Sequence, residues 1–192
     1  MKFSQQPVFG FTQPHNGIAN VLISDIVVSE AYQPQSGSNP PIGKPYKGIW
    51  DTGASCTIIN TRIISELNLQ PSGKMIVRAV GDSGKVNEYL TDTFLINIVL
   101  PNKVTVIGIN AAKGEISGAD ALIGMDIIAV GDFAITNVNG HTKLSFRTPS
   151  VEEIDFVREI DEYNRRHKKV NLPEDEKRRL RNRMKARRKK NR

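Results

Sequence analysis

The sequence predicts a mainly β protein, a small closed β-barrel-like domain with one or two short helices, followed by a basic helical tail. Short runs of valine, isoleucine and phenylalanine recur along most of the chain and are separated by Gly, Pro and Asn turn residues, as in β-barrels. Few segments before residue 150 show helical spacing. Beyond Pro149 the composition becomes strongly charged, which indicates an appendage to the domain.

Composition divides the 192 residues into three segments. Residues 1–17 are polar and rich in Gln, Pro and Gly, so we expect a flexible N-terminal arm. Residues 18–149 carry the strand-like runs and form the expected domain. Residues 150–192 form an amphipathic and then strongly basic tail, helical or disordered.

The first half of the domain is expected to contain strands around one short helix. Asn60 or Thr61 would cap this helix, which runs through Leu67. A surface loop rich in proline precedes the second strand. The expected strands are 18–28, 47–50 and 56–59, the loop is 33–47, and the hairpin that follows is 75–80 with 86–90.

The second half of the domain predicts further strands and one more helical turn. Pro101-Asn102 and Asn139-Gly140 are the expected turns, and residues 111–118 a loop. Met125 begins a short helix, in which Asp126 is expected as a helix-start residue or ion-pair partner. The expected strands are 93–100, 104–109, 121–124, 133–135 and 143–146.

The tail begins with an amphipathic pattern. Val151, Ile154, Ile160 and Tyr163 recur at helical spacing, with acidic residues at the start and basic residues at the end, an order that suits the helix dipole. Pro173 ends this pattern, and residues 174–192 form a second basic helix or no helix. The amphipathic helix is expected to pack on the domain or against its counterpart in a dimer.

The net charge of +7 is unevenly distributed. Residues 165–192 hold 15 of the 27 lysines and arginines and three acids, so the tail carries about +12 and the rest of the chain about −5. Such a tail attracts polyanions such as RNA, DNA or acidic proteins, although a solvated tail without a ligand explains the pattern equally well. Residues 165–192 lack glycine and aromatic residues, so the sequence predicts no base stacking there.

The single cysteine, Cys56, excludes an intrachain disulfide, and no His, Cys and acid cluster suggests a metal site. We expect no cofactor. The chain starts without a secretory signal and contains no apolar run of membrane-spanning length, so the sequence predicts a cytoplasmic protein without membrane contact.

One motif carries chemistry: Asp51, Thr52 and Gly53, preceded by Ile49-Trp50 and followed by Ala54 and Ser55. Amide hydrolysis by water needs one carboxylate as a base and one carboxylic acid to polarise the carbonyl. Two carboxyls held about 3 Å apart share one proton and supply both groups. The motif occurs once, so the second Asp51 would come from another copy of the chain, across a two-fold axis.

With this motif, two later landmarks make residues 18–147 resemble the retropepsin-like aspartic proteases, single-lobe enzymes that act as homodimers. The hairpin 79–89 resembles the flap of that family, with Gly81, Asp82, Ser83 and Gly84 at its turn. The run Leu122, Ile123 and Gly124 resembles the apolar element that packs beneath the site.

The resemblance implies a peptide or protein substrate, held in extended form under the flap. It also implies that Thr52 hydrogen-bonds across the dimer, that Ser55 contacts the outer oxygen of Asp51, and that the Gly53 N–H points at the carboxylate. The turn 81–84 is more polar than viral flaps often are, and Cys56 and Thr57 replace the acid that viral members carry there.

A second hypothesis remains beside the protease. The same domain could be a catalytically inactive module that binds extended peptides, with a polyanion-binding tail at residues 165–192. The state of association discriminates between them, because a monomer would hold half of a catalytic site.

Overall fold

The computed structural model describes residues 7–32, 41–80, 86–167, 175 and 178–179. The chain divides into two compact units, residues 1–152 and 153–192, and each is described by itself. The first unit holds ten strands among its described residues, which confirms the mainly β prediction. The second unit holds helix α3 (Phe156–His167) within its described part.

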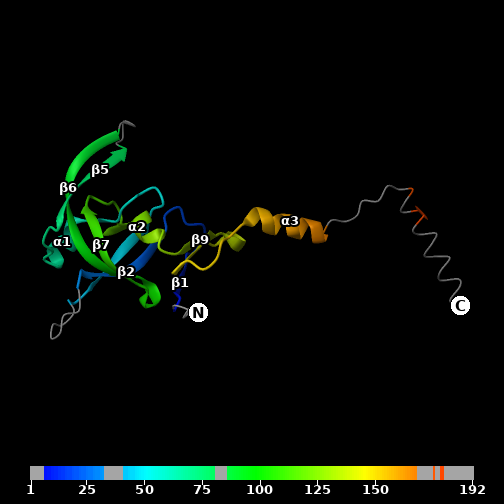
Figure 1. Cartoon of the computed structure of the whole chain (residues 1–192), viewed down its shortest axis with the longest axis horizontal. Coiled ribbons are helices and arrows are strands. Elements are labelled where there is room, and N and C mark those ends of the chain that lie inside the picture. The colour runs from blue at the N-terminus through cyan, green and yellow to red at the C-terminus, as the bar shows by residue number, and fades with distance from the viewer. Residues whose placement is uncertain (1–6, 33–40, 81–85, 168–174, 176–177, 180–192) are drawn as a thin grey trace, which may run out of the picture. The chain divides into compact units, whose positions relative to one another are not determined.

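Six strands of the first unit close into a ring. Each pairs with its neighbour in the order β2-β3-β8-β4-β7-β6, and β6 pairs again with β2, so the sheet becomes the barrel that the sequence predicts (Figure 1). The β3–β8 and β4–β7 pairs are parallel and the others antiparallel. The bounds are β2 Ile23–Glu30, β3 Lys44–Trp50, β4 Ile58–Ile59, β6 Val86–Val99, β7 Thr105–Lys113 and β8 Ala121–Ile123.

A long hairpin extends from the barrel. Strand β5 (Gly73–Val80) pairs with the first part of β6, from Gly73 opposite Thr93 to Val80 opposite Val86 (Figure 1). The runs 86–90 and 93–100, expected as two strands, form the single strand β6 because its inner half enters the barrel and its outer half pairs with β5. The expected turn residues 81–84 lie outside the described residues.

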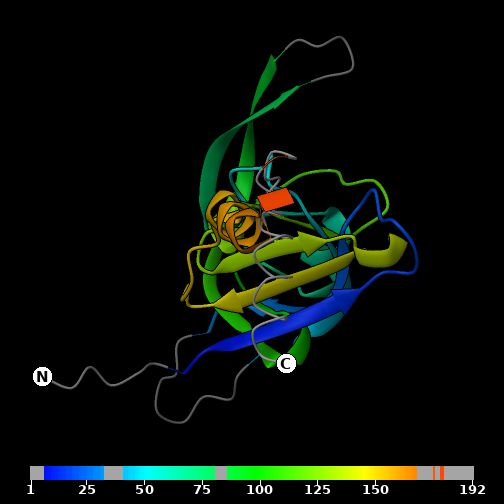
Figure 2. The same cartoon turned by 90° about the vertical axis from the view of Figure 1, so that its right-hand side faces the viewer.

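A second sheet of three strands has the order β1-β10-β9, with β1 at Phe9–Pro14, β9 at Asp132–Thr136 and β10 at Lys143–Thr148 (Figure 2). Strand β1 differs from the loose arm expected over residues 1–17. Its order comes from tertiary packing: Phe11 pairs with Phe146 across the strands and buries its ring against Trp50.

Two short α-helices flank the barrel strands. Helix α1 (Thr61–Glu66) starts where Asn60 accepts a hydrogen bond from the Ile63 N–H, at 3.1 Å, as its capping role predicts. Helix α2 (Met125–Ile128) follows Gly124 and begins at the expected residue. Single 3-10 turns occupy Pro101–Lys103 and Val138–Gly140.

The core is continuous between the two sheets. Aliphatic side chains from the barrel strands, such as Ile26, Ile96 and Ile123, are almost fully buried, and each stabilises the fold by about 1.5–3 kcal/mol. Phe11, Phe146 and Phe133 bring the three-stranded sheet against Trp50. Trp50, the residue directly before Asp51, is therefore buried where the two sheets meet.

Helix α3 (Phe156–His167) belongs to the second unit. It begins later than residue 151 because Asp155 caps it: the Asp155 carboxylate accepts hydrogen bonds from the Val157 and Arg158 N–H groups, at 3.0 and 3.1 Å. Most of the basic tail beyond residue 167 lies outside the described residues. No helix of the described part of the chain has the length and apolar character that crossing a membrane requires.

Candidate active site

Asp51 lies on a tight loop between β3 and β4, at the point where β3 leaves its parallel pairing with β8. The Asp51 N–H donates to the Ile123 carbonyl at 3.0 Å, which continues that pairing by one residue. The Gly53 N–H then donates to Asp51 Oδ1 at 2.8 Å, and the Ala54 N–H donates to the Asp51 carbonyl at 3.2 Å. The loop thus folds back on its own carboxylate and fixes it.

The loop lies at the surface of the first unit. Asp51 is half-buried, whereas Thr52, Gly53 and Ser55 are exposed. The contact expected between Ser55 and Asp51 is not among the hydrogen bonds of the described residues. The half-buried Asp51 thus lies among exposed neighbours, where a partner, a water or a substrate can approach the loop.

Trp50 anchors the loop from below. Its side chain is 5% exposed, stacks on Phe133 with ring centroids 5.5 Å apart, and donates from Nε1 to Ser24 Oγ at 3.0 Å. The hydrogen bond satisfies the one polar atom of the indole. Because Trp50 cannot shift without breaking this packing, it restricts the position of Asp51.

Leu122, Ile123 and Gly124 lie beside the loop. Leu122 is half-buried and Ile123 fully buried, in register with Ile49 and Trp50 of β3. Beyond them, the Met125 N–H donates to the Ala54 carbonyl at 2.8 Å. A Cβ on Gly124 would come within 2.5 Å of the carbonyl carbon and oxygen of Cys56, so this position has room only for glycine.

Thr57 and Asp126 form a contact that the sequence did not predict. Asp126 accepts hydrogen bonds from the Thr57 N–H at 2.9 Å and from the Thr57 hydroxyl at 2.8 Å. The fully buried Thr57 hydroxyl also accepts from the Gly124 N–H, at 3.4 Å. The Asp126 carboxylate on α2 therefore holds Thr57, the residue directly before β4, in place. From the sequence, we expect Asp126 only as a helix-start residue or ion-pair partner.

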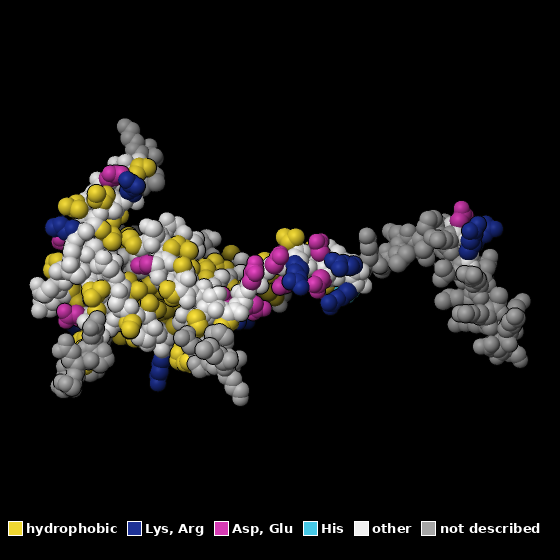
Figure 3. Space-filling model, in the orientation of Figure 1, with side chains coloured by type: hydrophobic (Ala, Val, Ile, Leu, Met, Phe, Trp, Pro, Cys, Tyr) yellow, Lys and Arg dark blue, Asp and Glu magenta, His cyan; other side chains and the backbone are white. Residues whose placement is uncertain are grey.

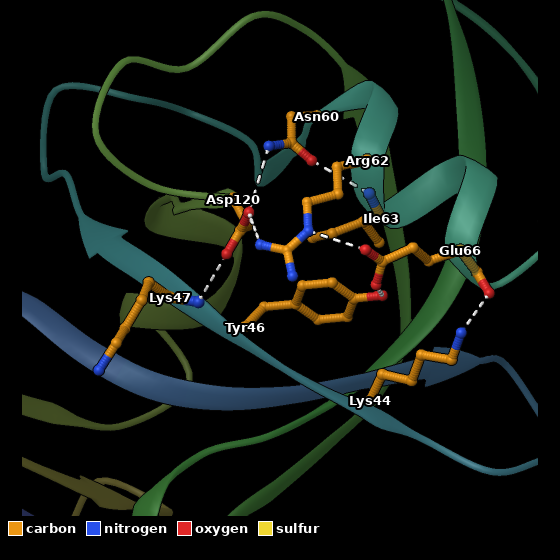
Figure 4. A network of polar contacts seen from close by, with 8 residues as sticks. All are labelled: Lys44, Tyr46, Lys47, Asn60, Arg62, Ile63, Glu66 and Asp120. Atoms are coloured by element: carbon orange, nitrogen blue, oxygen red, sulfur yellow. Dashed lines mark hydrogen bonds and ion pairs between the residues drawn. The ribbon is translucent and has the colours of Figure 1, made fainter.

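A second polar network holds the strands that enter the site (Figure 4). Asp120, which is 9% exposed, accepts from the Lys47 N–H and from Arg62 Nη1, each at 3.0 Å. Arg62 also donates to Glu66 and lies 5.5 Å from the centre of the Tyr46 ring. The network joins the start of β3, helix α1 and the start of β8, which are distant in sequence.

Electrostatics at this network follow from its hydrogen bonds. Burial, followed by the hydrogen bond and charge of Glu66, raises the pKa of Tyr46 to about 12. The Arg62 guanidinium, and then the Tyr46 hydroxyl, lower the pKa of Glu66. Tyr46 therefore stays neutral and Glu66 ionised around neutral pH, which keeps the network intact.

A groove of about 520 Å³ runs beside the Asp51 loop. Loop residues 53–56 and Ile58 form one wall, and residues 75–78 of β5 form the other. Within the described residues, strand β5 pairs with β6 on one side only and is the edge strand of its sheet. Cys56 lies in the wall, and burial, followed by the charge of Asp126, raises the pKa of its thiol. A raised pKa disfavours the nucleophilic thiolate.

The flap residues Gly81, Asp82, Ser83 and Gly84 lie outside the described residues, and their role stays a prediction. Their hairpin stem, β5 and β6, does form, and it borders the groove. Within the described part of the chain, no three His, Cys, Asp or Glu side chains gather as metal ligands.

Comparison with known proteins gives one family match. Residues 42–127 match the family model of the aspartyl proteases. No curated protein matches the chain. Among solved structures, the chain is similar to the crystal structure of a retropepsin-like aspartic protease from Rickettsia conorii, with a TM-score of 0.42 and 16% identity over 74% of this chain and 94% of that one.

Proposed function

From the match of residues 42–127 to the aspartyl protease family model, we propose that the chain is an aspartic endopeptidase that works as a homodimer. The observation that carries the proposal is the loop at Asp51, which lies at the surface of the first unit and whose carboxylate accepts a hydrogen bond from the Gly53 N–H. One such loop occurs in the sequence, and the reaction requires two carboxyls.

The proposed reaction uses Asp51 of each of two copies. With one proton shared between the two carboxyls, the ionised member removes a proton from water while the protonated member hydrogen-bonds to the scissile carbonyl. The water oxygen attacks the carbonyl carbon, and the leaving nitrogen then receives a proton as the bond breaks. Because one carboxyl must stay protonated, we expect a pH optimum on the acid side of neutrality.

The groove supports an extended peptide as the substrate. It lies between the Asp51 loop and the open edge of β5, where a peptide backbone can add hydrogen bonds as a further strand. Met75 and Ile58 make part of its wall apolar. The hairpin that ends in the turn 81–84 is proposed to close over this peptide as a flap.

The test is cleavage of a mixed peptide library at pH 4 to 7 by the wild type and by Asp51→Asn, with a pepstatin-type inhibitor in parallel. Asparagine keeps the oxygen that accepts from Gly53 but cannot act as the base, so we expect loss of cleavage with unchanged folding and dimerisation. Cleavage by Asp51→Asn would refute the assignment of Asp51. No cleavage by a dimeric wild type would favour the inactive peptide-binding module.

A further inference from the structure

Helix α3 carries an apolar stripe. Phe156, Ile160 and Tyr163 follow one another at spacings of four and three residues, which places them on one face of the helix. Their exposed fractions are 65%, 56% and 62%. His167 continues the stripe and stacks on Tyr163, with ring centroids 4.0 Å apart. Large side chains that are exposed in a row indicate a contact surface.

The opposite face of α3 is already occupied by ion pairs. Glu162 pairs with Arg158 at 3.5 Å and with Arg166 at 3.3 Å, each one helical turn away. These pairs keep the polar face soluble and the helix straight. The apolar stripe is thus the face that is free to bind a partner.

Charge is polarised along the helix. Asp155 caps its start and Glu159 lies in its first turn, whereas Arg165, Arg166 and His167 form its last turn. Figure 3 shows acidic and basic side chains exposed along this helix. The helix dipole adds positive potential at the start and negative potential at the end. A partner with the reverse order of charge complements this surface.

We propose that the apolar stripe of α3 binds α3 of a second copy of this chain, in antiparallel orientation. An antiparallel pair places the acidic start of each helix against the basic end of the other, whereas a parallel pair would bring like charges together. A two-fold axis perpendicular to both helices generates this arrangement. The helix of a second copy is therefore a complementary partner in shape and in charge.

One register fits the stripe to itself. With the two-fold axis between Ile160 and Tyr163, Ile160 of one copy lies opposite Tyr163 of the other, and Phe156 lies opposite His167. All four stripe positions then meet an apolar or aromatic partner. The same register brings Glu159 of each copy close to Arg166 of the other.

The contact extends the proposed homodimer beyond the protease domain. Its 12 residues span about 18 Å, so this helix pair is too short to hold two chains together alone. This inference rests on the proposed homodimer. Two copies that are joined through their first units would hold their α3 helices at a high effective concentration, which favours helix pairing. The helix pair would then slow dissociation of the active dimer.

Disulfide trapping in the full chain tests the orientation, with Cys56→Ser as the common background. We expect a mixture of Phe156→Cys and His167→Cys chains to cross-link under mild oxidation, and each variant alone to remain uncross-linked. The reason is distance, because Phe156 residues of an antiparallel pair lie about 16 Å apart along the axis. Efficient cross-linking of each variant with itself would indicate a parallel pair and overturn the proposal.

Substitutions on the two faces provide the matched control. Ile160→Gln in both chains should lower the yield of the mixed cross-link about tenfold, because it removes apolar burial twice while glutamine preserves the helix. Asp161→Asn, near the middle of the polar face, should leave the yield unchanged. Equal yields would overturn the apolar contact.

Sedimentation and peptide cleavage separate this proposal from the function. If the protein is a dimer that cleaves peptides but gives no mixed cross-link, the proposed protease function is retained and the proposed helix pair is overturned. If the mixed cross-link forms but the protein cleaves no peptide, the proposed helix pair is retained and the result counts against the proposed protease function.

Discussion

At the scale of single residues, Asp126 connects the Asp51 loop to α2. Its two carboxylate oxygens accept from the backbone and the hydroxyl of Thr57, six residues after Asp51. The sequence motif identifies Asp51, but nothing in the sequence pairs Thr57 with an acid 69 residues away. The resemblance to the retropepsin-like family implied which neighbours contact Asp51. One of these contacts is present, because the Gly53 N–H donates to the Asp51 carboxylate.

Asp126→Asn should destabilise the fold and slow cleavage. An amide keeps one acceptor and turns a donor toward a donor of Thr57, so we expect a loss of about 1–3 kcal/mol in the free energy of unfolding. The released loop should lower kcat roughly tenfold or more. Chemical denaturation and peptide cleavage measure both effects. Asp25→Asn, which removes an exposed carboxylate, is the control, and an Asp126 variant that behaves like it would show that the Thr57 contacts contribute nothing.

At the scale of elements, the sequence predicted which segments form strands but not all of their partners. Turn residues placed the β5–β6 hairpin, and Asn60 placed the start of α1. The β2–β6 pairing that closes the barrel joins segments about 70 residues apart, and alternation of side chains carries no information on such partners. Strand β1 was missed because its order depends on Trp50 and Phe146, not on its own composition.

The junction of β8 and α2 gives a prediction at this scale. Gly124→Ala would force its Cβ into the Cys56 backbone, so the two elements must separate, at a cost of about 1–3 kcal/mol or more. The φ angle of Gly124 is −90°, which suits any residue, and the requirement is therefore space alone. Thermal unfolding measures it. Gly73→Ala is the matched control, because its Cβ would meet only the Thr93 hydroxyl, at 3.3 Å. Equal midpoints for both variants would contradict this account.

Asp132 connects β9 to β10 and to the segment that follows. The Ser150 hydroxyl, then the Val151 N–H and then Arg147, hold the pKa of its carboxyl well below its usual range. The folded state therefore gains stability while Asp132 is ionised. This gain is complete above about pH 4, the usual carboxyl pKa, and is lost as the pH falls through the lower folded pKa.

Asp132→Asn should consequently lower the melting temperature at pH 6 and flatten its decline below about pH 4. Melting curves from pH 2 to 6 for both proteins measure the difference, with Glu153→Gln as a control for loss of an exposed carboxylate. Parallel pH profiles would remove Asp132 as a source of acid sensitivity. The contacts of Asp132 thus stabilise the folded state fully in most of the acid range in which the proposed pair of Asp51 carboxyls works.

At the scale of the whole molecule, the proposed active site requires two copies of the chain. Mixing equal amounts of wild type and Asp51→Asn, at constant total protein and with free exchange, should leave about a quarter of the cleavage activity, because only that share of dimers carries two intact carboxyls. A peptide substrate and a titration of mixing ratios measure this. Activity that falls only to one half would mean that each chain acts alone or that the copies do not exchange, and sedimentation distinguishes these two cases.

Trp50 gives the molecule a built-in optical probe. It is the only tryptophan of the chain, it is buried, and it directly precedes Asp51, the proposed catalytic residue. Its fluorescence therefore arises from one position under Asp51, with Phe133 and Ser24 as its immediate surroundings. An emission spectrum shifted to short wavelength should mark the packed site, and a shift to longer wavelength should mark its exposure to water. Assembly or peptide binding that disturbs the loop can thus be followed in the unlabelled protein.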